Sequence, residues 1–473
     1  MRPVYTEELQ MPVKKPKPLT RLVARYVKNV RYNDVPERIL LPLRQSLVDT
    51  AGCGVLGSTT RVATLMRDYV DSWKSSPEAT IWGTPLKASV PFAAMANCAA
   101  SHAWDFDDTI MPAVLHPGSV AVPTALAIAE HARTAVSGKA LLTAIAAGYE
   151  VGNVVGTALG SKAFASGGFY NSVPTIFVAV ATAAKLMNLS EEETVRALGM
   201  AATQSAGLYS ATLTKRINAP KAVLGGIFAA ELARRGLEAP ADGLEAEYSG
   251  FLGTFSRSPE PDVIPRDLGR YRFEIFHKIY PCIRSNHPSV ENIKLLLEEH
   301  PEIKTSAIRK IVSHVDQLTV DYTVKTTAGG SEGVNTPGNA LVSFQYCVAA
   351  MAVDRELTLR QFTPRRVKDP RIQQLMRKIH CVADPSIDKL PATKRYRCTV
   401  DVYLENGTRL KRFLAGPKGD PNNRLTAGEM FDKFQANTNS ALPQRQTTRL
   451  FNFLRDIERQ PDVRKIGRLL ATR

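Results

Sequence analysis

The sequence lacks the features of a membrane or secreted protein. No apolar run reaches about 18 residues without a charge or a turn signal, so we predict no membrane span. The N-terminus has no secretory apolar segment, and the C-terminus is not a peroxisomal address. Glu7 and Glu8 argue against a strong mitochondrial presequence, whereas the basic stretch from Lys14 to Arg31 keeps that compartment open. We expect a cytoplasmic protein, with the mitochondrion as the alternative location.

The sequence also lacks paired cysteines and nucleic-acid motifs. Its six cysteines form no C-x-x-C pair and lie mostly in apolar runs, which is typical of reduced, buried thiols and argues against a zinc site. The formal net charge is +16, but the basic residues are scattered, and no zinc finger, RNP-type strand or Gly-Arg repeat accompanies them. Scattered basic residues are typical of a solvated surface or of a field that attracts small polyanions. We expect no nucleic acid partner.

Helical periodicity dominates the first half of the chain. Residues 1–17 are Pro/Lys-rich and are expected to be disordered. Ala-rich helical patterns with Gly or Pro breaks then cover residues 88–108, 119–135, 138–159, 172–188, 190–208 and 218–236. Their small-residue faces let helices approach closely, so residues 18–265 are predicted to form a helical bundle.

The segment Gly52-Cys-Gly-Val-Leu-Gly57 has the letters of a dinucleotide-binding loop, G-x-G-x-x-G. It follows a helical pattern rather than a strand, and no alternation of strands and helices surrounds it. We interpret it as a small-residue contact between helices.

The pattern changes after Pro265. β-Branched residues recur over residues 308–325, and residues 395–414 alternate around Asn406-Gly407, a strong hairpin signal. Two further segments have helical periodicity: 339–353 and 370–380. Residues 266–415 are therefore predicted to form an α+β domain, and helices in residues 416–473 to rejoin the bundle. The predicted fold class is mainly α, with a large all-α bundle built from both chain ends and a smaller α+β domain.

The segment from Ser101 to Thr109 is the strongest candidate for a site. An apolar helical run ends there with a histidine, three carboxylates and a threonine. At helical spacing His102, Asp105 and Thr109 share one face. His116 follows a short loop, and Pro117 marks where a new helix can begin. Such an arrangement predicts an acid/base site on a helical scaffold, with a buried polar network as the alternative.

Several ordered motifs resemble those of MmgE/PrpD proteins, a family that includes 2-methylcitrate dehydratase and cis-aconitate decarboxylase. The resemblance runs from about Leu19 to Phe434. It rests on Asp49-Thr-Ala-Gly-Cys-Gly54, His102-x-x-Asp-Phe-Asp-Asp-Thr109, His116-Pro-Gly118, Gly148-Tyr-Glu-Val-Gly152, Thr214-Lys-Arg216, Lys278-Ile-Tyr-Pro-Cys282, His287, Ser343-Phe-Gln-Tyr346 and Gly419-Asp-Pro421.

This resemblance implies an active site between the bundle and the α+β domain, which would act as a lid. It also implies a homodimer that needs no metal or organic cofactor. The positions it places at the active site are Asp105, Thr109, His116, Lys215 and Lys278, and Tyr170 and Arg216 are added as substrate-binding candidates. In this interpretation the cations neutralise a tricarboxylate, and Asp105 and His116 handle the proton. His102, Asp107 and Asp108 are left out, the two carboxylates as helix-end or loop groups that pair with basic residues.

Three positions depart from the decarboxylase-like members of the family. Tyr170 and Ile283 each stand where those members carry a histidine, and Ile217-Asn-Ala-Pro220 stands where they carry Leu-His-x-Gly, with Asn218 in place of the histidine. The sequence therefore favours dehydration of 2-methylcitrate or a longer 2-alkylcitrate by a cofactor-independent lyase. The alternatives are decarboxylation of cis-aconitate or a related unsaturated tricarboxylic acid, and a non-catalytic scaffold of the same fold.

Overall fold

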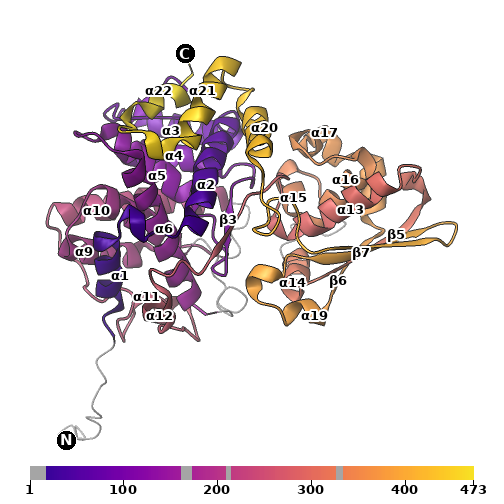
Figure 1. Ribbon diagram of the computed structural model, residues 1–473, viewed down its shortest axis with the longest axis horizontal. Helices are drawn as coiled ribbons and strands as arrows, with labels where there is room; N and C mark the ends of the chain where they lie inside the picture. Colours follow the sequence, from indigo (N-terminus) through magenta and orange to yellow (C-terminus); the bar gives the residue numbers. More distant parts are fainter. Residues whose placement is uncertain (1–16, 161–172, 209–214, 326–333, 473) are drawn as a thin grey trace, which may run out of the picture.

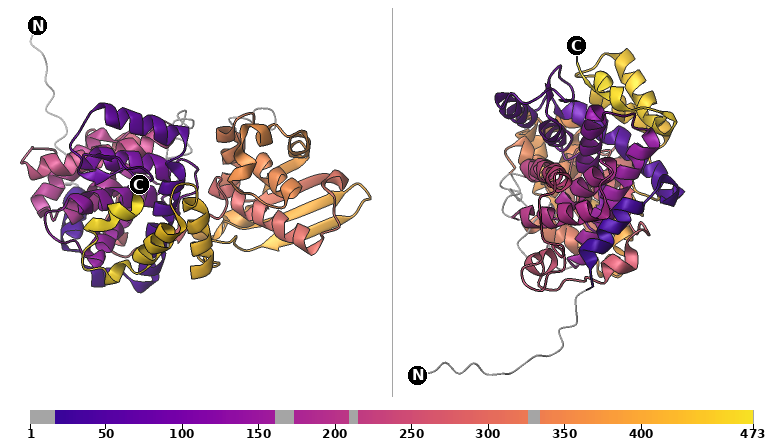
Figure 2. Two further views of the ribbon diagram at one scale, coloured as in Figure 1. Left: turned by 90° about the horizontal axis from the view of Figure 1, so that it is seen from above. Right: turned by 90° about the vertical axis from the view of Figure 1, so that its left-hand side faces the viewer.

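A computed structural model describes residues 17–160, 173–208, 215–325 and 334–472. The chain is mainly α-helical, as predicted. Across the described ranges, no helix combines the length and the apolar character that a membrane crossing requires. Two parts lie side by side: a helical part (residues 17–276 and 420–472) and an α+β part (residues 280–414), each with its own buried apolar cluster (Figures 1 and 2).

The helical part contains long helices and two pairs of very short strands. Its helices are α1 (Leu19–Asn29), α2 (Glu37–Gly57), α3 (Arg61–Ser72), α4 (Val90–Ser101), α5 (Gly118–His131), α6 (Gly138–Ala158), α8 (Thr175–Leu186), α9 (Glu191–Gln204), α10 (Lys215–Arg234), α11 (Phe251–Phe255), α12 (Val263–Asp267), α20 (Ala427–Thr438), α21 (Gln444–Arg455) and α22 (Gly467–Leu470). Its strand pairs are β1 (Ala79–Thr80) with β2 (Lys87–Ala88), and β3 (Thr109–Met111) with β4 (Glu274–Phe276).

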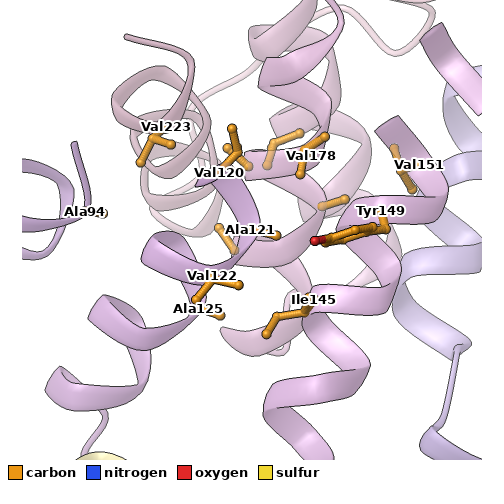
Figure 3. Close-up of a cluster of buried hydrophobic side chains, with 14 of the residues drawn as sticks. Ala94, Val120, Ala121, Val122, Ala125, Ile145, Tyr149, Val151, Val178 and Val223 are labelled. Atoms are coloured by element: carbon orange, nitrogen blue, oxygen red, sulfur yellow. The ribbon is translucent and has the colours of Figure 1, made fainter. Parts of the chain in front are cut away.

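Small side chains allow the central helices to pack closely. Ala121 and Ala125 of α5 lie with Val178 of α8 and Val223 of α10 in one buried cluster (Figure 3). Tyr149 of α6 is the largest side chain labelled in this view, and it is fully buried. Such interdigitation of Ala, Val and one aromatic ring is the close approach that the Ala-rich patterns predicted.

The Gly52–Gly57 segment is part of α2, so its interpretation as a helix contact is confirmed. A Cβ atom on Gly57 would lie 1.8 Å from the carbonyl oxygen of Ala100 in α4, and one on Gly54 would lie 2.4 Å from the ring of Trp82. No side chain fits at these distances, because non-bonded carbon atoms require about 3.5 Å.

The α+β part is built on a four-stranded sheet in the order β6-β5-β7-β8. Strand β5 runs parallel to β6 and antiparallel to β7, and β7 and β8 form the predicted hairpin, with Gly407 at a φ of +88°. The strands are β5 (Ile308–Val315), β6 (Ile379–Ala383), β7 (Cys398–Leu404) and β8 (Arg409–Leu414). The helices are α13 (His287–Glu299), α14 (Gln317–Lys325), α15 (Pro337–Val342), α16 (Phe344–Asp354), α17 (Pro364–Val367), α18 (Pro370–Met376) and α19 (Pro385–Asp388).

Three predicted helices are wrong in their extent. The helix predicted over 88–108 ends at Ser101, and a turn follows. The helix predicted over 339–353 is interrupted at Ser343, whose hydroxyl accepts a hydrogen bond from the Tyr346 amide and starts a new helix, α16. The helix predicted over 370–380 ends at Met376, because residues from Ile379 onward pair with β5 in the sheet.

Helices from the C-terminal segment pack on the first ones. Helices α20 and α21 both contact α2, and Phe434 and Leu450 belong to the same buried cluster as Leu43 and Leu47. Helix α20 lies on the side of the helical part that faces the α+β part (Figure 1). The exact domain limits, and the movement of residues 266–415 as a lid, stay predictions.

Candidate active site

The strand pair β3–β4 brings two distant segments together. Thr109 pairs with Phe276 across this antiparallel ladder. Asp105 lies just before β3 and Lys278 just after β4, so both residues lie at the same end of the pair. The Lys278 ammonium Nζ lies 2.7 Å from both the carboxylate Oδ1 and the backbone carbonyl oxygen of Asp105. Their side chains are only 1% and 8% exposed, so this is a buried ion pair.

The conformation of Asp105 differs from the prediction. His102, Asp105 and Thr109 do not share a helix face, because Asp105 has a φ of +50° in the turn after α4 and Thr109 belongs to a strand. Aspartate enters this left-handed region more readily than most non-glycine residues. Here the conformation accompanies two contacts with Lys278, one from the backbone and one from the side chain. A regular helix would instead use that carbonyl in its own hydrogen bonds.

His116 lies between two carboxylates. Its Nε2 is 3.8 Å from Oδ1 of Asp105, and its Nδ1 is 3.3 Å from Oδ2 of Asp107. Asp107 also contacts Nδ1 of His102 at 2.9 Å, and the two imidazole rings meet edge to face with centroids 4.8 Å apart. Burial by itself raises the pKa of Asp107, but the two histidines hold that pKa well below its ordinary value.

Asp107 lies in a loop, as predicted, although the sequence left it out of the site residues. It is fully buried and pairs with two histidines, and no lysine or arginine among the described residues forms an ion pair with it. Its signal was the spacing His102–Asp107, five residues along the chain, which a turn can close and a continuous helix cannot.

Asp108 also lies in this loop, but its hydrogen-bond partners among the described residues are not the basic side chains that were predicted. It is fully buried and accepts hydrogen bonds from the Ser46 hydroxyl at 2.7 Å, the Tyr149 hydroxyl at 2.5 Å and the Gly118 amide at 3.0 Å. Burial raises the pKa of Asp108 to about 7, in spite of the hydrogen bonds from Tyr149 and Ser46. Asp108 thus holds α5 and α6 to the loop that follows α4, residues 102–108, which we call the acidic turn.

Thr109 offers a hydroxyl to a ligand. Its side chain is 8% exposed, and its Oγ1 atom is buried without a hydrogen-bond partner among the described residues. Buried hydroxyls are normally hydrogen-bonded, and an orphan at such a place points to a ligand or water. The predicted place of Thr109 in the active site stays a prediction.

Of the predicted cations on the Thr214-Lys-Arg216 motif, Arg216 is the one whose side chain is described. It is half-buried on α10, and burial lowers its pKa while the nearby charge of Asp105 opposes the shift. The charge of Asp105 therefore acts on Arg216 as well as on Lys278, which Asp105 contacts directly. Lys215 begins α10 but its side chain lies outside the described part, and so does Tyr170.

The donor atoms of His102, Asp107 and His116 lie within 4.8 Å of one another, a spacing that a metal ion could use. In this structure both histidines instead direct Nδ1 toward the same carboxylate oxygen. The set suits hydrogen bonding between imidazole and carboxylate, and the expectation that the protein needs no metal stays a prediction.

A buried ion pair, an imidazole between two carboxylates and an unpartnered hydroxyl, all at the edge of a helical part, define a candidate acid/base site for an anionic substrate. The sequence model of the MmgE/PrpD N-terminal domain matches residues 21–264, and that of the MmgE/PrpD C-terminal domain matches residues 280–457. The chain belongs to the MmgE/PrpD family.

Relatives match over nearly the whole chain. Human cis-aconitate decarboxylase is 28% identical over 474 residues, which cover 96% of this chain and 95% of the relative. The cis-aconitate decarboxylase-like protein oryM of Aspergillus oryzae is 26% identical over 479 residues, covering 96% and 97%. A cis-aconitate decarboxylase of Aspergillus terreus is 25% identical over 482 residues, covering 96% of each chain.

Proposed function

We propose that this protein is a lyase that decarboxylates cis-aconitate or a related unsaturated tricarboxylic acid. The observation that carries the proposal is the buried group formed by Lys278, Asp105 and His116. The charge of Asp105 also acts on Arg216. The relatives are cis-aconitate decarboxylases or similar to them, and this favours decarboxylation, which the sequence had placed second.

The reaction breaks one carbon–carboxylate bond. The electron pair of this bond passes into the adjacent alkene–carboxylate system, carbon dioxide leaves, and a proton adds to carbon. Lys278 uses two of its three N–H donors on Asp105 and keeps one for a substrate carboxylate. Arg216 and the Thr109 hydroxyl are the other groups we assign to the substrate carboxylates.

His116 is the proposed proton donor. Its side chain is 14% exposed, so solvent can return the proton after each turnover. Asp107 orients the imidazole through Nδ1, which leaves Nε2 on the side of Asp105 and the substrate. In this scheme Asp105 positions both Lys278 and His116.

Dehydration of 2-methylcitrate or a 2-alkylcitrate is the second candidate. The same acid/base group would remove the proton next to a carboxylate and protonate the leaving hydroxide. It is favoured by the departures at Tyr170, Ile283 and Asn218. Asn218 has a buried side-chain nitrogen without a hydrogen-bond partner in the described part of the chain, so it is available to a ligand.

The test incubates the purified full-length protein with cis-aconitate, citrate, 2-methylcitrate and longer 2-alkylcitrates. Release of carbon dioxide from cis-aconitate supports the first proposal. Formation of an alkene from an alkylcitrate without carbon dioxide supports the second. If no acid reacts and none raises the melting temperature at millimolar concentration, both proposals fail and the non-catalytic scaffold stands. The homodimer and the cytoplasmic location stay predictions.

A further inference from the structure

Lys433 contacts the candidate active site from the far end of the sequence. Its ammonium Nζ lies 3.1 Å from the carbonyl oxygen of Phe106 and 2.6 Å from the carbonyl oxygen of Lys278. Its third partner is the carboxylate of Asp49, at 2.5 Å. An ammonium group has three N–H donors, so these three acceptors use its full capacity.

The three acceptors come from three separate parts of the chain. Phe106 follows Asp105 in the acidic turn, Lys278 is a site residue itself, and Asp49 belongs to α2. Lys433 comes from α20, the helix at the boundary between the helical part and the α+β part (Figure 1). The ammonium also lies 3.9 Å from the centre of the Phe106 ring.

This group is buried. The side chain of Lys433 is 7% exposed and that of Asp49 is fully buried. Burial raises the pKa of Asp49, and the neighbouring charge of Lys433 opposes that shift. A buried lysine with all donors satisfied holds its acceptors in fixed positions, because any movement leaves a charge or a carbonyl unpaired.

We propose that Lys433 is a positioning residue that fixes Asp105 and Lys278 relative to each other. It does so by donating hydrogen bonds to the carbonyl of Phe106, which follows Asp105, and to the carbonyl of Lys278. The proposal rests on the function proposed above. Lys433 contacts the backbone of both segments and bonds neither reacting side chain. Its loss should therefore slow the chemical step more than it weakens substrate binding.

The test compares Lys433→Met with Lys433→Arg and with the double variant Asp49→Asn/Lys433→Met. The double variant also removes the buried charge of Asp49 and so restores charge balance. It does not restore the hydrogen bonds of Lys433 to the carbonyls of Phe106 and Lys278, which we call the tether. Arg44→Met is the control, because the Arg44–Glu458 ion pair at 2.6 Å also ties α2 to the C-terminal segment but includes none of the candidate site residues. Turnover of the reactive acid and hydrogen exchange are measured on each full-length variant.

We expect Lys433→Met to lower kcat about 10- to 100-fold with KM changed less than about threefold, since small misplacements of reacting groups have effects of this size. Lys433→Arg should regain at least part of kcat, and the double variant should regain stability but stay slow. Arg44→Met should keep kcat within about twofold. Unchanged kcat in the folded fraction of Lys433→Met would overturn the proposal.

Hydrogen exchange separates this proposal from the proposed function. Peptides covering residues 102–108 and 276–280 should exchange faster in Lys433→Met and in the double variant, but not in Arg44→Met. If the wild-type protein converts no tricarboxylate, the proposed function fails and the exchange result decides the tether alone. Equal exchange of these peptides in wild type and Lys433→Met overturns the proposal that Lys433 is a positioning residue.

Discussion

Removing both partners of the Asp105–Lys278 ion pair should restore the stability that either single substitution costs, but it should not restore activity. The variants are Asp105→Asn, Lys278→Met and the two combined. Because both charges are almost fully buried and 2.7 Å apart, each single variant leaves one partner uncompensated. Removing one partner of a buried pair costs about 3–5 kcal/mol, whereas replacing both is often close to neutral.

We expect each single variant to lower the free energy of unfolding by about 3 kcal/mol or more, and the double variant to lose at least about 2 kcal/mol less than the sum. Turnover should fall at least about 100-fold in all three, since the double variant restores packing but not chemistry. Urea denaturation gives the coupling energy, and carbon dioxide release or alkene formation gives turnover. If the loss in the double variant equals the sum of the two single losses within about 0.5 kcal/mol, the stabilising interaction between Asp105 and Lys278 is refuted. Normal turnover in the folded double variant would refute the assignment of these residues to the site.

Four further predictions follow from neighbouring groups. Thr109→Val should leave the free energy of unfolding unchanged or slightly higher, because the hydroxyl is buried without a described partner, and should raise KM; an unchanged KM would remove Thr109 from the site. Asp107→Asn should lower kcat about 100-fold with little change in KM, because His116 loses the carboxylate at its Nδ1, and steady-state kinetics would show it. The raised pKa of Asp108 means that the folded protein holds a proton which the unfolded chain releases near pH 4. Stability from this group is therefore present below about pH 4 and lost as the pH rises through about 7, and Asp108→Asn should flatten that part of the stability profile in urea titrations. Treatment with EDTA should leave turnover unchanged; loss of activity that zinc restores would instead assign a metal to His102, Asp107 and His116.

The fold could be predicted from the sequence where the signal was local. The helices α5, α6 and α10 begin and end within a few residues of the predicted ranges, because apolar periodicity and Gly or Pro breaks act over a few turns. The Asn406-Gly407 hairpin is confirmed for the same reason. Predictions were wrong where a tertiary contact overrode periodicity, as at Ile379, which joins the sheet instead of extending a helix.

For the candidate site, motifs identified several of the residues but not their arrangement. The sequence singled out Asp105, His116 and Lys278, but it placed Asp105 on a helix face. The turn after Ser101 forms because Asp107 and Asp108 bond in different directions, one to two histidines and the other to α2, α5 and α6. A continuous helix could not aim both carboxylates at these partners.

The sequence alone determined the helical character, the family resemblance and the chemical types at the site. These depend on residue identity and short spacing, which a chain carries in any conformation. Only the tertiary structure decided that Lys278 meets Asp105 and that Lys433 bonds the carbonyl of Phe106, next to Asp105, and the carbonyl of Lys278 itself. Phe106 and Lys433 are 327 residues apart in sequence. Such contacts are set by the packing of α20 on α2 and by the pairing of β3 with β4, since no local pattern records which distant segments a core will bring together.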